Sequence, residues 1–360
     1  MNDTFQRLMA DATQLTRSGD LRAATAAIQA AIGGTTVSTH AALDDTAVIE
    51  GEAREITEEG SSNEAPTFGQ FIGGTYADKN GSRDYKLFIP SGGISKPLPL
   101  VVMLHGCTQN PDDFALGTGM NDAALAQGFF VLYPAQTQNA NASRCWNWFM
   151  RSHQQRDIGE PAILANMTRD VMAKFNVDPQ RVYVAGLSAG GAMAAILGDA
   201  YPDLFAAVGV HSGLATGSAK DVQSAFGVMN SGVSAGSSRT FEAVHQTPPT
   251  IVFHGDQDMT VNPANGVRVA AVSAAESAAE TERGQSENGR NYTKNIYRKS
   301  NGQVNTEHWV VHGAAHAWSG GSARGSYTDA RGPSATKEML RFFFAHTLNI
   351  ALKTPPQAAL

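Results

Sequence analysis

The sequence predicts an α/β fold in which a doubly wound, mostly parallel sheet carries helices on both faces. Between residues 100 and 346, short apolar runs rich in β-forming residues alternate with segments of helical character. Such alternation is typical of parallel sheets. A serine also stands in a glycine-rich turn directly after one of these runs, and parallel sheets place their functional residues at the carboxyl ends of their strands. The fold class therefore predicts where a site should lie.

The composition is that of a folded protein with a large domain. A chain of 360 residues can hold one large α/β domain together with a small one, and its hydrophobic fraction of 42% supports a sizeable core. The formal net charge of -6 offers no basic surface for phosphates, which excludes nucleic acid as an expected partner. Only 17% of the residues are charged and 36 are glycines, a balance that favours an enzyme with many loops over a helical bundle.

Residues 1–34 predict a helical hairpin. Apolar side chains recur at helical spacing before and after a break at Ser18-Gly19, and Gly33-Gly34 ends the second helix. Such a pair cannot bury both apolar faces alone, so we expect it to dock on the main domain or on a partner. Residues 35–66 are acidic and poor in large apolar side chains, and this composition predicts a flexible linker.

Residues 67–352 predict the α/β domain itself. It opens with a hairpin, whose strands at 69–76 and 85–89 flank an Asp-Lys-Asn-Gly-Ser turn. Further strands are predicted from apolar runs at 100–104, 129–133, 182–185, 206–210 and 251–253. Helices are predicted between and after them, at 122–127, 161–175, 189–199, 267–280 and 337–346.

The stretch 186–190 reads Gly-Leu-Ser-Ala-Gly and fits the G-x-S-x-G pattern of a strand-to-helix elbow. In α/β-hydrolases this turn holds a serine hydroxyl exposed above the sheet. The pattern is short, but a buried-strand run precedes it and an alanine-rich run without proline follows it. These neighbours favour an α/β-hydrolase fold with Ser188 as a nucleophile over a glycine-rich turn with an incidental serine.

A serine hydroxyl is a poor nucleophile at neutral pH, so it needs a base and a third group that orients the base. In α/β-hydrolases these partners follow in the order Ser, acid, His. The turn after the strand at 251–253 offers two carboxylates, Asp256 and Asp258. We expect Asp258 to be the acid, because it has enough loop to reach back toward the serine. Asp256 stays the alternative, and helix capping would explain either carboxylate taken alone.

Three histidines stand four residues apart, at His308, His312 and His316. Helical spacing would suggest a metal site, but the glutamate of H-E-x-x-H does not occur and Trp309-Val310-Val311 favours a strand. We therefore expect no metal. His308 and His312 are predicted on the strand. His316 lies beyond it among small residues, where its imidazole can reach Ser188 and act as general base.

Acyl transfer to a serine also needs two backbone N–H groups for the oxyanion. The residue after the nucleophile supplies one, and a loop after an early strand supplies the other. We therefore expect Ala189 and Cys107 to be the donors. Cys107 lies in Leu-His-Gly-Cys-Thr-Gln at 104–109, directly after the strand at 100–104.

Charged residues interrupt every apolar stretch near the N-terminus, and no segment has the apolar length that spans a bilayer. These observations predict a cytoplasmic protein with no signal peptide and no transmembrane segment. In that compartment Cys107 and Cys145 would be thiols. Two cysteines are also too few for a disulfide scaffold or a four-cysteine zinc site.

Six motifs in order make the sequence resemble the poly(3-hydroxybutyrate) depolymerase family of esterases, which is related to the acetylxylan and feruloyl esterases. They read Leu-His-Gly-Cys-Thr-Gln at 104–109, Arg-Cys-Trp-Asn-Trp-Phe at 144–149, Gly-Leu-Ser-Ala-Gly-Gly at 186–191, His-Ser-Gly-Leu at 211–214, His-Gly-Asp-Gln-Asp-Met-Thr-Val at 254–261 and Gly-Ala-Ala-His-Ala-Trp-Ser-Gly-Gly at 313–321. The resemblance runs from about residue 68 to residue 347 and leaves out the hairpin and the linker.

The resemblance implies a serine carboxylic-ester hydrolase of α/β-hydrolase fold that needs no metal or organic cofactor. It maps the nucleophile, acid and base onto Ser188, Asp258 and His316. It also implies a disulfide between Cys107 and Cys145, which conflicts with the predicted cytoplasmic location.

The expected substrates are poly- or oligo-(3-hydroxyalkanoate) esters. Exported depolymerases of the family carry a signal peptide and usually a polymer-binding domain. Neither is recognised in this sequence, which favours smaller or intracellular esters as substrates. Trp146, Trp148 and Trp318 lie in loops flanking the inferred site. They predict an aromatic wall for an acyl chain or a sugar ring, with plugs of the core as the alternative. One alternative function is an acetylxylan- or feruloyl-type polysaccharide esterase. Another is a non-catalytic protein that binds granules or a partner.

Overall fold

The computed structural model describes residues 69–91, 96–232, 247–274 and 280–348. The chain divides into two units, residues 1–67 and 68–360, and all of the described residues belong to the second. The predicted helical hairpin at 1–34 and linker at 35–66 therefore lie outside the described residues.

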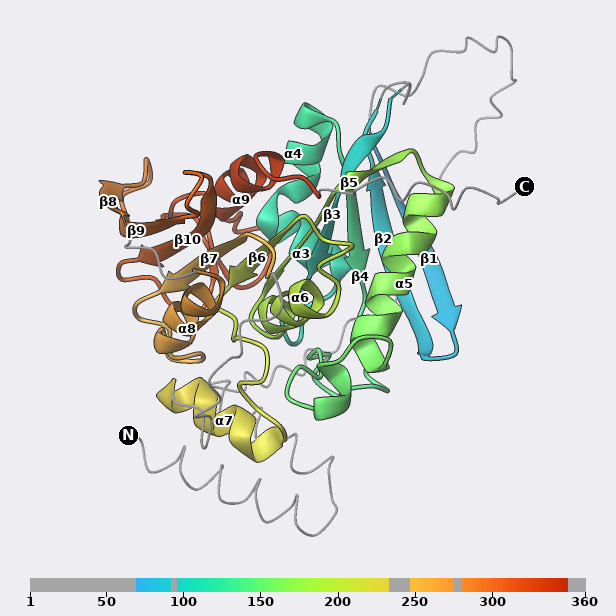
Figure 1. Ribbon diagram of the computed structural model, residues 1–360, viewed down its shortest axis with the longest axis horizontal. Helices are drawn as coiled ribbons and strands as arrows, with labels where there is room; N and C mark the ends of the chain where they lie inside the picture. Colours follow the sequence, from blue (N-terminus) through green and yellow to red (C-terminus); the bar gives the residue numbers. More distant parts are fainter. Residues whose placement is uncertain (1–68, 92–95, 233–246, 275–279, 349–360) are drawn as a thin grey trace, which may run out of the picture. The chain divides into compact units, whose positions relative to one another are not determined.

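A ten-stranded sheet forms the centre of the second unit, in the order β1-β2-β4-β3-β5-β6-β7-β10-β9-β8 (Figure 1). The strands are β1 Gln70–Asp78, β2 Gly81–Ile89, β3 Leu98–Leu104, β4 Phe130–Pro134, β5 Val177–Leu187, β6 Ala207–His211, β7 Thr250–Gly255, β8 Glu280–Gln285, β9 Asn291–Arg298 and β10 Val304–Val311. From β4 to β10 in this order, neighbouring strands run parallel. Antiparallel strands flank them, β1 and β2 at one edge and β9 and β8 at the other.

The central strands β3, β4 and β6 are almost wholly apolar, as is typical of parallel strands that are covered on both faces. In β3, Leu100 and Val102 pack on one face of the sheet, and Val101 and Met103 pack on the other. All four side chains are fully buried. The continuous apolar runs in the sequence therefore form the buried central strands, as predicted.

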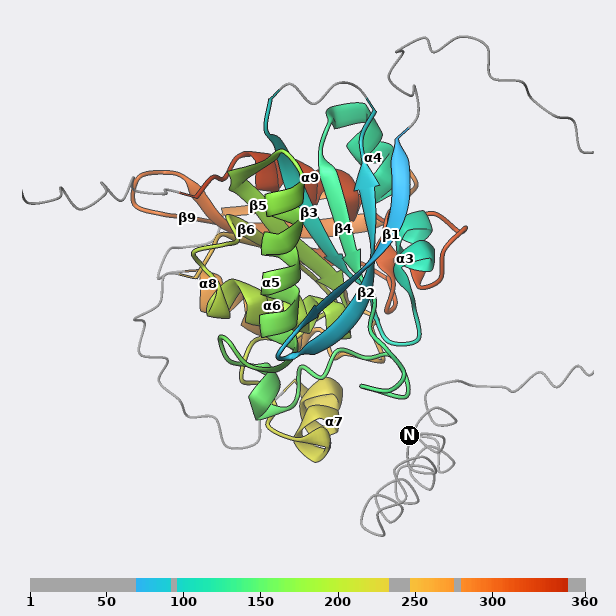
Figure 2. The same cartoon turned by 90° about the vertical axis from the view of Figure 1, so that its right-hand side faces the viewer.

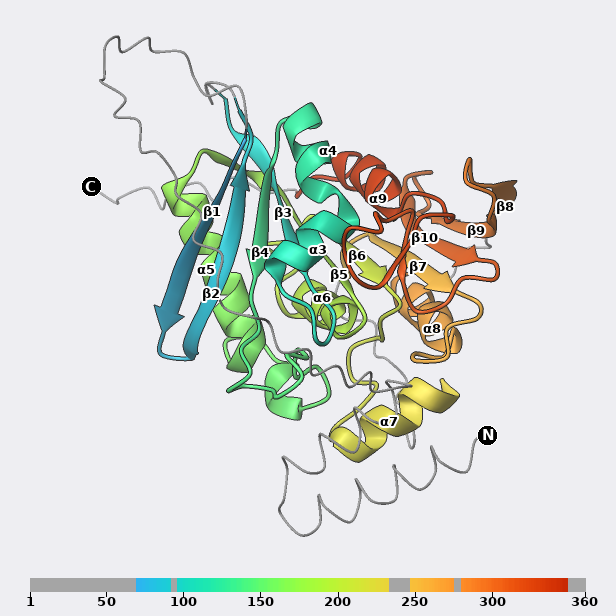
Figure 3. The ribbon, with the colours of Figure 1, turned by 180° about the vertical axis from the view of Figure 1, so that it is seen from behind.

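Helices cover both faces of the sheet (Figure 2 and Figure 3). One face carries α5 Gly159–Lys174, α6 Ala189–Ala200 and α8 Ala264–Ser273, and the other carries α3 Pro111–Thr118, α4 Met120–Gln127 and α9 Ala335–Phe344. The remaining elements are the 3-10 turn η1 Arg151–His153, the helix α7 Val222–Ser231 and the small sheet of β11 Trp318–Ser319 and β12 Thr328–Asp329. None of the helices in the described part of the chain combines the length and apolar character that crossing a bilayer requires.

The helix predicted at 267–280 is wrong at its end. The helix α8 ends at Ser273, and Glu280 begins the exposed strand β8. This strand reads Glu-Thr-Glu-Arg-Gly-Gln, which has no apolar alternation from which a strand could be predicted. Its conformation is set by antiparallel pairing with β9. The sequence patterns also predict neither β9 nor the short helices α3 and α7.

Candidate active site

Ser188 lies in a strained turn between β5 and α6. Its backbone has φ 57° and ψ -119°, a conformation that residues with a Cβ rarely adopt. Gly186 and Gly190 make the turn possible. A Cβ on Gly190 would collide with the carbonyl oxygen of Leu104, and a Cβ on Gly186 would collide with the backbone of Gly190. The chain thus forms a tight elbow at the carboxyl end of a central strand, and Ser188 is 9% exposed there.

Asp258 lies in the turn after β7 with its side chain fully buried. Its Oδ1 accepts hydrogen bonds from the N–H groups of Thr260 and Val261, at 2.9 and 2.8 Å. Its Oδ2 lies 2.7 Å from Nδ1 of His316. Burial alone would favour the neutral acid, but hydrogen bonds from the imidazoles of His254 and His316 overcome it and hold the pKa of Asp258 well below its ordinary value. The carboxylate therefore stays ionised at neutral pH.

His316 lies in the loop after β10 and donates its Nδ1–H to Asp258. The neutral ring consequently carries its lone pair on Nε2, which is the tautomer that a general base needs. Among the described residues, no hydrogen bond joins this Nε2 to the hydroxyl of Ser188. Such bonds are often long in a protein without substrate and shorten in the complex. The acid and the base are therefore already assembled, and the contact to the serine is the one left to form.

His211, the last residue of β6, connects the elbow to the segment that carries His316. Its carbonyl oxygen accepts the N–H of Ser188 at 2.9 Å, and its Nε2 accepts the N–H of Ser319 at 2.9 Å. Burial lowers the pKa of His211 well below its ordinary value, so the ring stays neutral and can accept. In the sequence, His211 opens the motif at 211–214 and follows an apolar strand run, but neither signal assigns it a role.

Asp256, the alternative acid, pairs with a different histidine. Its Oδ2 lies 2.9 Å from Nδ1 of His312, and its Oδ1 accepts the N–H of Gly313 at 2.7 Å. Nε2 of His312 lies 2.9 Å from the hydroxyl of Thr293. Both nitrogens of this imidazole are therefore occupied, and the carboxylate that reaches His316 is not Asp256.

The three histidines spaced four apart point into different surroundings. His308 is buried on β10, His312 follows the strand, and His316 lies in the loop beyond it. Among the residues that the structure describes, no group of three or more His, Cys, Asp and Glu side chains is arranged to hold a metal ion. The spacing of four belongs here to a strand and its following loop.

The two expected oxyanion donors lie beside the elbow. Ala189 is the first residue of α6, where N–H groups have no partner within the helix. The loop with Cys107 follows β3 and packs on the elbow, because a Cβ added to Gly106 would lie 3.7 Å from Cβ of Ser188. Within the described ranges, the N–H groups of Cys107 and Ala189 donate to no backbone acceptor. Both are thus available to bind a developing negative charge near the serine.

A disulfide joins Cys107 to Cys145, 38 residues further along the chain. It ties the loop after β3 to the segment after β4. Hydrogen bonds brace the same connection, because Trp146 Nε1 donates to the carbonyl of His105 at 3.1 Å and the N–H of Gln136 donates to His105 Nε2 at 3.1 Å. The structure therefore holds the disulfide that the family resemblance implies, and not the free thiols expected of a cytoplasmic protein.

Glu160 in the first turn of α5 holds the segment after β4 through hydrogen bonds. It is a buried carboxylate that accepts the N–H of Asn147 at 2.7 Å and the side-chain amide of Gln136 at 2.5 Å. The guanidinium of Arg83 in β2 also lies 3.2 Å from this carboxylate. From the sequence, the stretch at 157–160 could be a substrate contact or a helix cap, and neither reading predicts the buried partners that Glu160 has here.

The three tryptophans do not form the expected aromatic wall. Trp146 is 0%, Trp148 5% and Trp318 1% exposed. Trp318 packs against His211 and against the edge of Phe114, in the core beneath the site. Indole rings in loops gain free energy by filling the space between the loops and the sheet. The alternative, that these side chains are plugs of the core, is the correct one.

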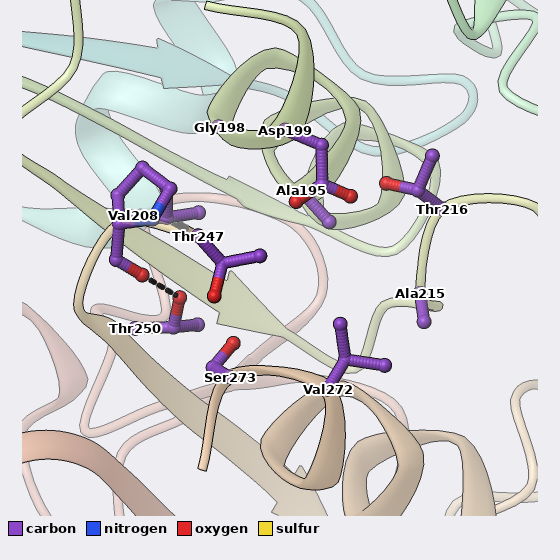
Figure 4. A pocket seen from close by; sticks show the side chains of 11 residues that line it. Ala195, Gly198, Asp199, Val208, Ala215, Thr216, Thr247, Thr250, Val272 and Ser273 are labelled. Carbon is purple, nitrogen blue, oxygen red and sulfur yellow. Dashed lines mark hydrogen bonds between the residues drawn. The ribbon is translucent and has the colours of Figure 1, made fainter. Parts of the chain in front are cut away.

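A small pocket lies elsewhere on the sheet (Figure 4). Its lining includes Val208 and Thr250, near the amino ends of β6 and β7, and Asp199 near the end of α6. The hydroxyl of Thr250 donates to the carbonyl of Pro248 at 2.9 Å. None of the nucleophile, acid and base residues lines this pocket, so it is separate from the chemistry described above.

Comparison with known proteins places the chain among esterases. The family model for "Esterase PHB depolymerase" matches residues 83–274. The chain is 30% identical over 236 residues to the poly(3-hydroxyalkanoate) depolymerase C of Paucimonas lemoignei, which covers 63% of this chain and 56% of the relative. It is 30% identical over 250 residues to the poly(3-hydroxybutyrate) depolymerase of Ralstonia pickettii, which covers 64% of this chain and 50% of the relative. The chain thus spans about half the length of these curated relatives.

A more distant relative and a solved structure complete the comparison. The probable acetylxylan esterase A of Neosartorya fischeri is 27% identical over 193 residues, which covers 50% of this chain and 51% of the relative. The structure of the acetyl xylan esterase from Aspergillus awamori matches with a TM-score of 0.56 at 20% identity and covers 73% of this chain and 94% of that one. This likeness shows the fold, which is that of an α/β-hydrolase.

Proposed function

The chain belongs to the esterase PHB depolymerase family, and on this premise we propose that it hydrolyses carboxylic esters with Ser188 as nucleophile, Asp258 as acid and His316 as base. The observation that carries the proposal is the buried pair of Asp258 and His316, whose Oδ2 and Nδ1 lie 2.7 Å apart. The pair follows β7 and β10, and Ser188 follows β5 at the same carboxyl edge of the sheet.

The mechanism follows from the atoms that are free to act. Nε2 of His316 takes the proton of Ser188, the serine oxygen attacks the ester carbonyl, and the N–H groups of Ala189 and Cys107 stabilise the oxyanion. His316 then gives the proton to the leaving alcohol, so that an acyl-enzyme remains. Water repeats the steps on the acyl group and releases the acid. Asp258 stays ionised throughout and stabilises the imidazolium.

As substrates we propose poly- or oligo-(3-hydroxyalkanoate) esters. Two relatives are named as depolymerases of poly(3-hydroxyalkanoate) and poly(3-hydroxybutyrate), which supports this class. The second candidate is an acylated polysaccharide, because a further relative is named as a probable acetylxylan esterase. The cytoplasmic location and the docking of the N-terminal hairpin stay predictions.

The first experiment replaces the nucleophile. Ser188→Ala should lower kcat for p-nitrophenyl butyrate about a million-fold, because the residues of such a relay act as a unit. Retention of hydrolysis by this variant would contradict the proposal. A fluorophosphonate probe should label the wild-type protein and not Ser188→Ala. If the probe labels neither protein, the non-catalytic binding alternative is favoured.

The second experiment separates the two substrate classes. We expect purified protein to release product from 3-hydroxybutyrate oligomers at a higher kcat/KM than from acetylated xylan. The reverse order would transfer the assignment to the polysaccharide esterases while leaving the serine mechanism intact.

A further inference from the structure

Asp258 is in contact with a second imidazole besides that of His316. His254 of β7 is 1% exposed. Its Nε2 lies 2.8 Å from the carbonyl oxygen of Val261 and 3.4 Å from Oδ2 of Asp258. The same Oδ2 receives Nδ1 of His316. Two imidazoles therefore converge on one carboxylate oxygen.

The hydrogen bonds of His254 define its tautomer. A carbonyl oxygen can only accept, so Nε2 facing Val261 carries the hydrogen. Nδ1 is buried and has no partner in the part of the chain that the structure describes. The helix α8 covers this side of the ring, because a Cβ on Gly266 would lie 2.6 Å from Nδ1. A hydrogen on Nδ1 would be buried without an acceptor, which is unfavourable. His254 is therefore a neutral Nε2–H donor.

Four titratable groups of the described residues face this ring. His308 of β10 and His211 of β6 are its imidazole neighbours, and Asp258 and His316 complete the set. Burial lowers the pKa of His308 to about 4 and that of His211 well below its ordinary value. The carboxylate of Asp258 lies on the Nε2 side of the ring and would favour a cation, whereas the buried Nδ1 without an acceptor opposes one.

We propose that His254 is a positioning residue for the acid of the relay. Its Nε2–H closes the turn after β7 onto Val261 and holds Oδ2 of Asp258 in line with His316. Oδ1 is already fixed by two N–H groups of the same turn. His254 therefore restrains Oδ2, the carboxylate oxygen that orients the ring of His316. The inference rests on the proposed function, because the orientation matters only if His316 acts as the base.

Two consequences distinguish this role from packing alone. Without the Nε2–H donor, the turn loosens and His316 is aimed less accurately, which lowers kcat. Asp258 then has one hydrogen-bond donor fewer, so its negative charge stabilises the imidazolium of His316 more strongly. The acid limb of the kcat/KM profile therefore moves to higher pH. KM should change little, because His254 is buried behind the acid and does not reach substrate.

The test compares two replacements of His254 with a matched control. His254→Leu keeps the volume and removes the donor, whereas the side-chain amide of His254→Gln can place an N–H near the position of Nε2. We expect His254→Leu to lower kcat about 10- to 100-fold, as a misplacement of about 1 Å does, and to shift the acid limb upward. His254→Gln should recover most of kcat and the wild-type limb. His308→Leu removes the neighbouring buried imidazole and should leave kcat and the limb unchanged.

Equal losses in His254→Leu and His254→Gln with unshifted pH profiles would overturn the proposal, and so would an unimpaired His254→Leu. Wild-type protein supplies a measurement that needs no variant. Nitrogen NMR of the histidine rings should show His254 as the neutral Nε2–H tautomer across the pH range of activity, and a hydrogen on Nδ1 would also overturn the proposal.

The outcome is separable from that of the proposed function. The downfield proton resonance of the hydrogen bond between Asp258 and His316 should shift in His254→Leu and stay in His254→Gln, whether or not any ester is turned over. If the resonance responds in this way but Ser188→Ala retains hydrolysis, His254 still positions Asp258, and the assignment of Ser188 as the nucleophile falls.

Discussion

Two carboxylate–imidazole pairs arise from the same two stretches of chain and differ in what they can do. Asp258 with His316 and Asp256 with His312 have similar separations, 2.7 and 2.9 Å. In the first pair the side chains are 0% and 11% exposed, and in the second they are 32% and 41% exposed. Nε2 of His312 is engaged by Thr293, whereas no hydrogen bond occupies Nε2 of His316 in the described part of the chain.

The comparison shows that a short Asp–His contact does not by itself make a relay. A general base needs a nitrogen that is still free, and a carboxylate is worth most where water does not screen it. The pKa of both carboxyls lies below the ordinary value, although burial opposes ionisation in each. Hydrogen bonds from the partner imidazole and from backbone N–H groups provide the compensation at both positions. Burial and the free Nε2 are what single out the pair at His316.

The largest effect should separate the two carboxylates directly. Asp258→Asn should lower kcat about ten-thousand-fold, because an amide cannot hold the imidazole in the correct tautomer or stabilise its cation. Asp256→Asn should lower kcat less than about tenfold, since Asp256 acts only on the loop through Gly313 and His312. Steady-state kinetics on p-nitrophenyl butyrate measure both. Comparable losses of kcat in the two variants would contradict the assignment of Asp258, rather than Asp256, as the acid.

The disulfide between Cys107 and Cys145, which belongs to neither pair, should contribute more to stability than the pair of Asp256 and His312. Removing the disulfide with Cys145→Ser should lower the free energy of unfolding by about 3–4 kcal/mol, the value expected for a closed loop of this length. We also expect kcat to fall, because the N–H of Cys107 is an expected oxyanion donor. The acid limb of the pH profile should not move, because Cys107 is not a partner of Asp258 or His316. Urea unfolding and a pH–rate profile test both points. A shift of the acid limb in Cys145→Ser would mean that the loop after β3 also positions Asp258 and His316.

His308 extends the comparison to a buried imidazole without a hydrogen bond to its Nε2 in the described residues. Burial lowers its pKa from 6.5 to about 4. A base with a depressed folded pKa contributes its full stability above the unfolded pKa, and the contribution is lost as the pH falls from about 6.5 to about 4. This loss amounts to about 3 kcal/mol. His308→Leu should therefore flatten the dependence of unfolding free energy on pH in this window, and an unchanged slope would count against burial of a neutral ring.

The smallest effect concerns the exposed pair. Asp256→Asn should lower the free energy of unfolding by at most about 1 kcal/mol, because a partly exposed ion pair contributes little and is screened by salt. Chemical unfolding in low and high salt should show the difference shrinking as salt rises. A loss of several kcal/mol that is insensitive to salt would place Asp256 in the same class as Asp258.

Much of this protein follows from its sequence because the signals are local. The apolar runs determine the central strands by their lack of alternation, and Gly186 and Gly190 determine the elbow at Ser188 because no side chain fits beside the neighbouring backbone. The order of Ser188, Asp258 and His316 along the chain is that of the fold. The strands and the elbow depend on residues within a few positions of one another, so they can be predicted before any contact is known.

The tertiary structure alone decided which carboxylate meets which histidine, since Asp256 and Asp258 are two residues apart and only the packing of β7 beside β10 assigns them. It also decided that the tryptophans are buried and that the polar strand β8 exists by pairing with β9. The role of His254 likewise depends on the fold of the turn that brings Val261 back to it. The physical reason is shared: burial, charge pairing and edge-strand conformation are properties of what surrounds a residue, and those neighbours come from distant parts of the chain.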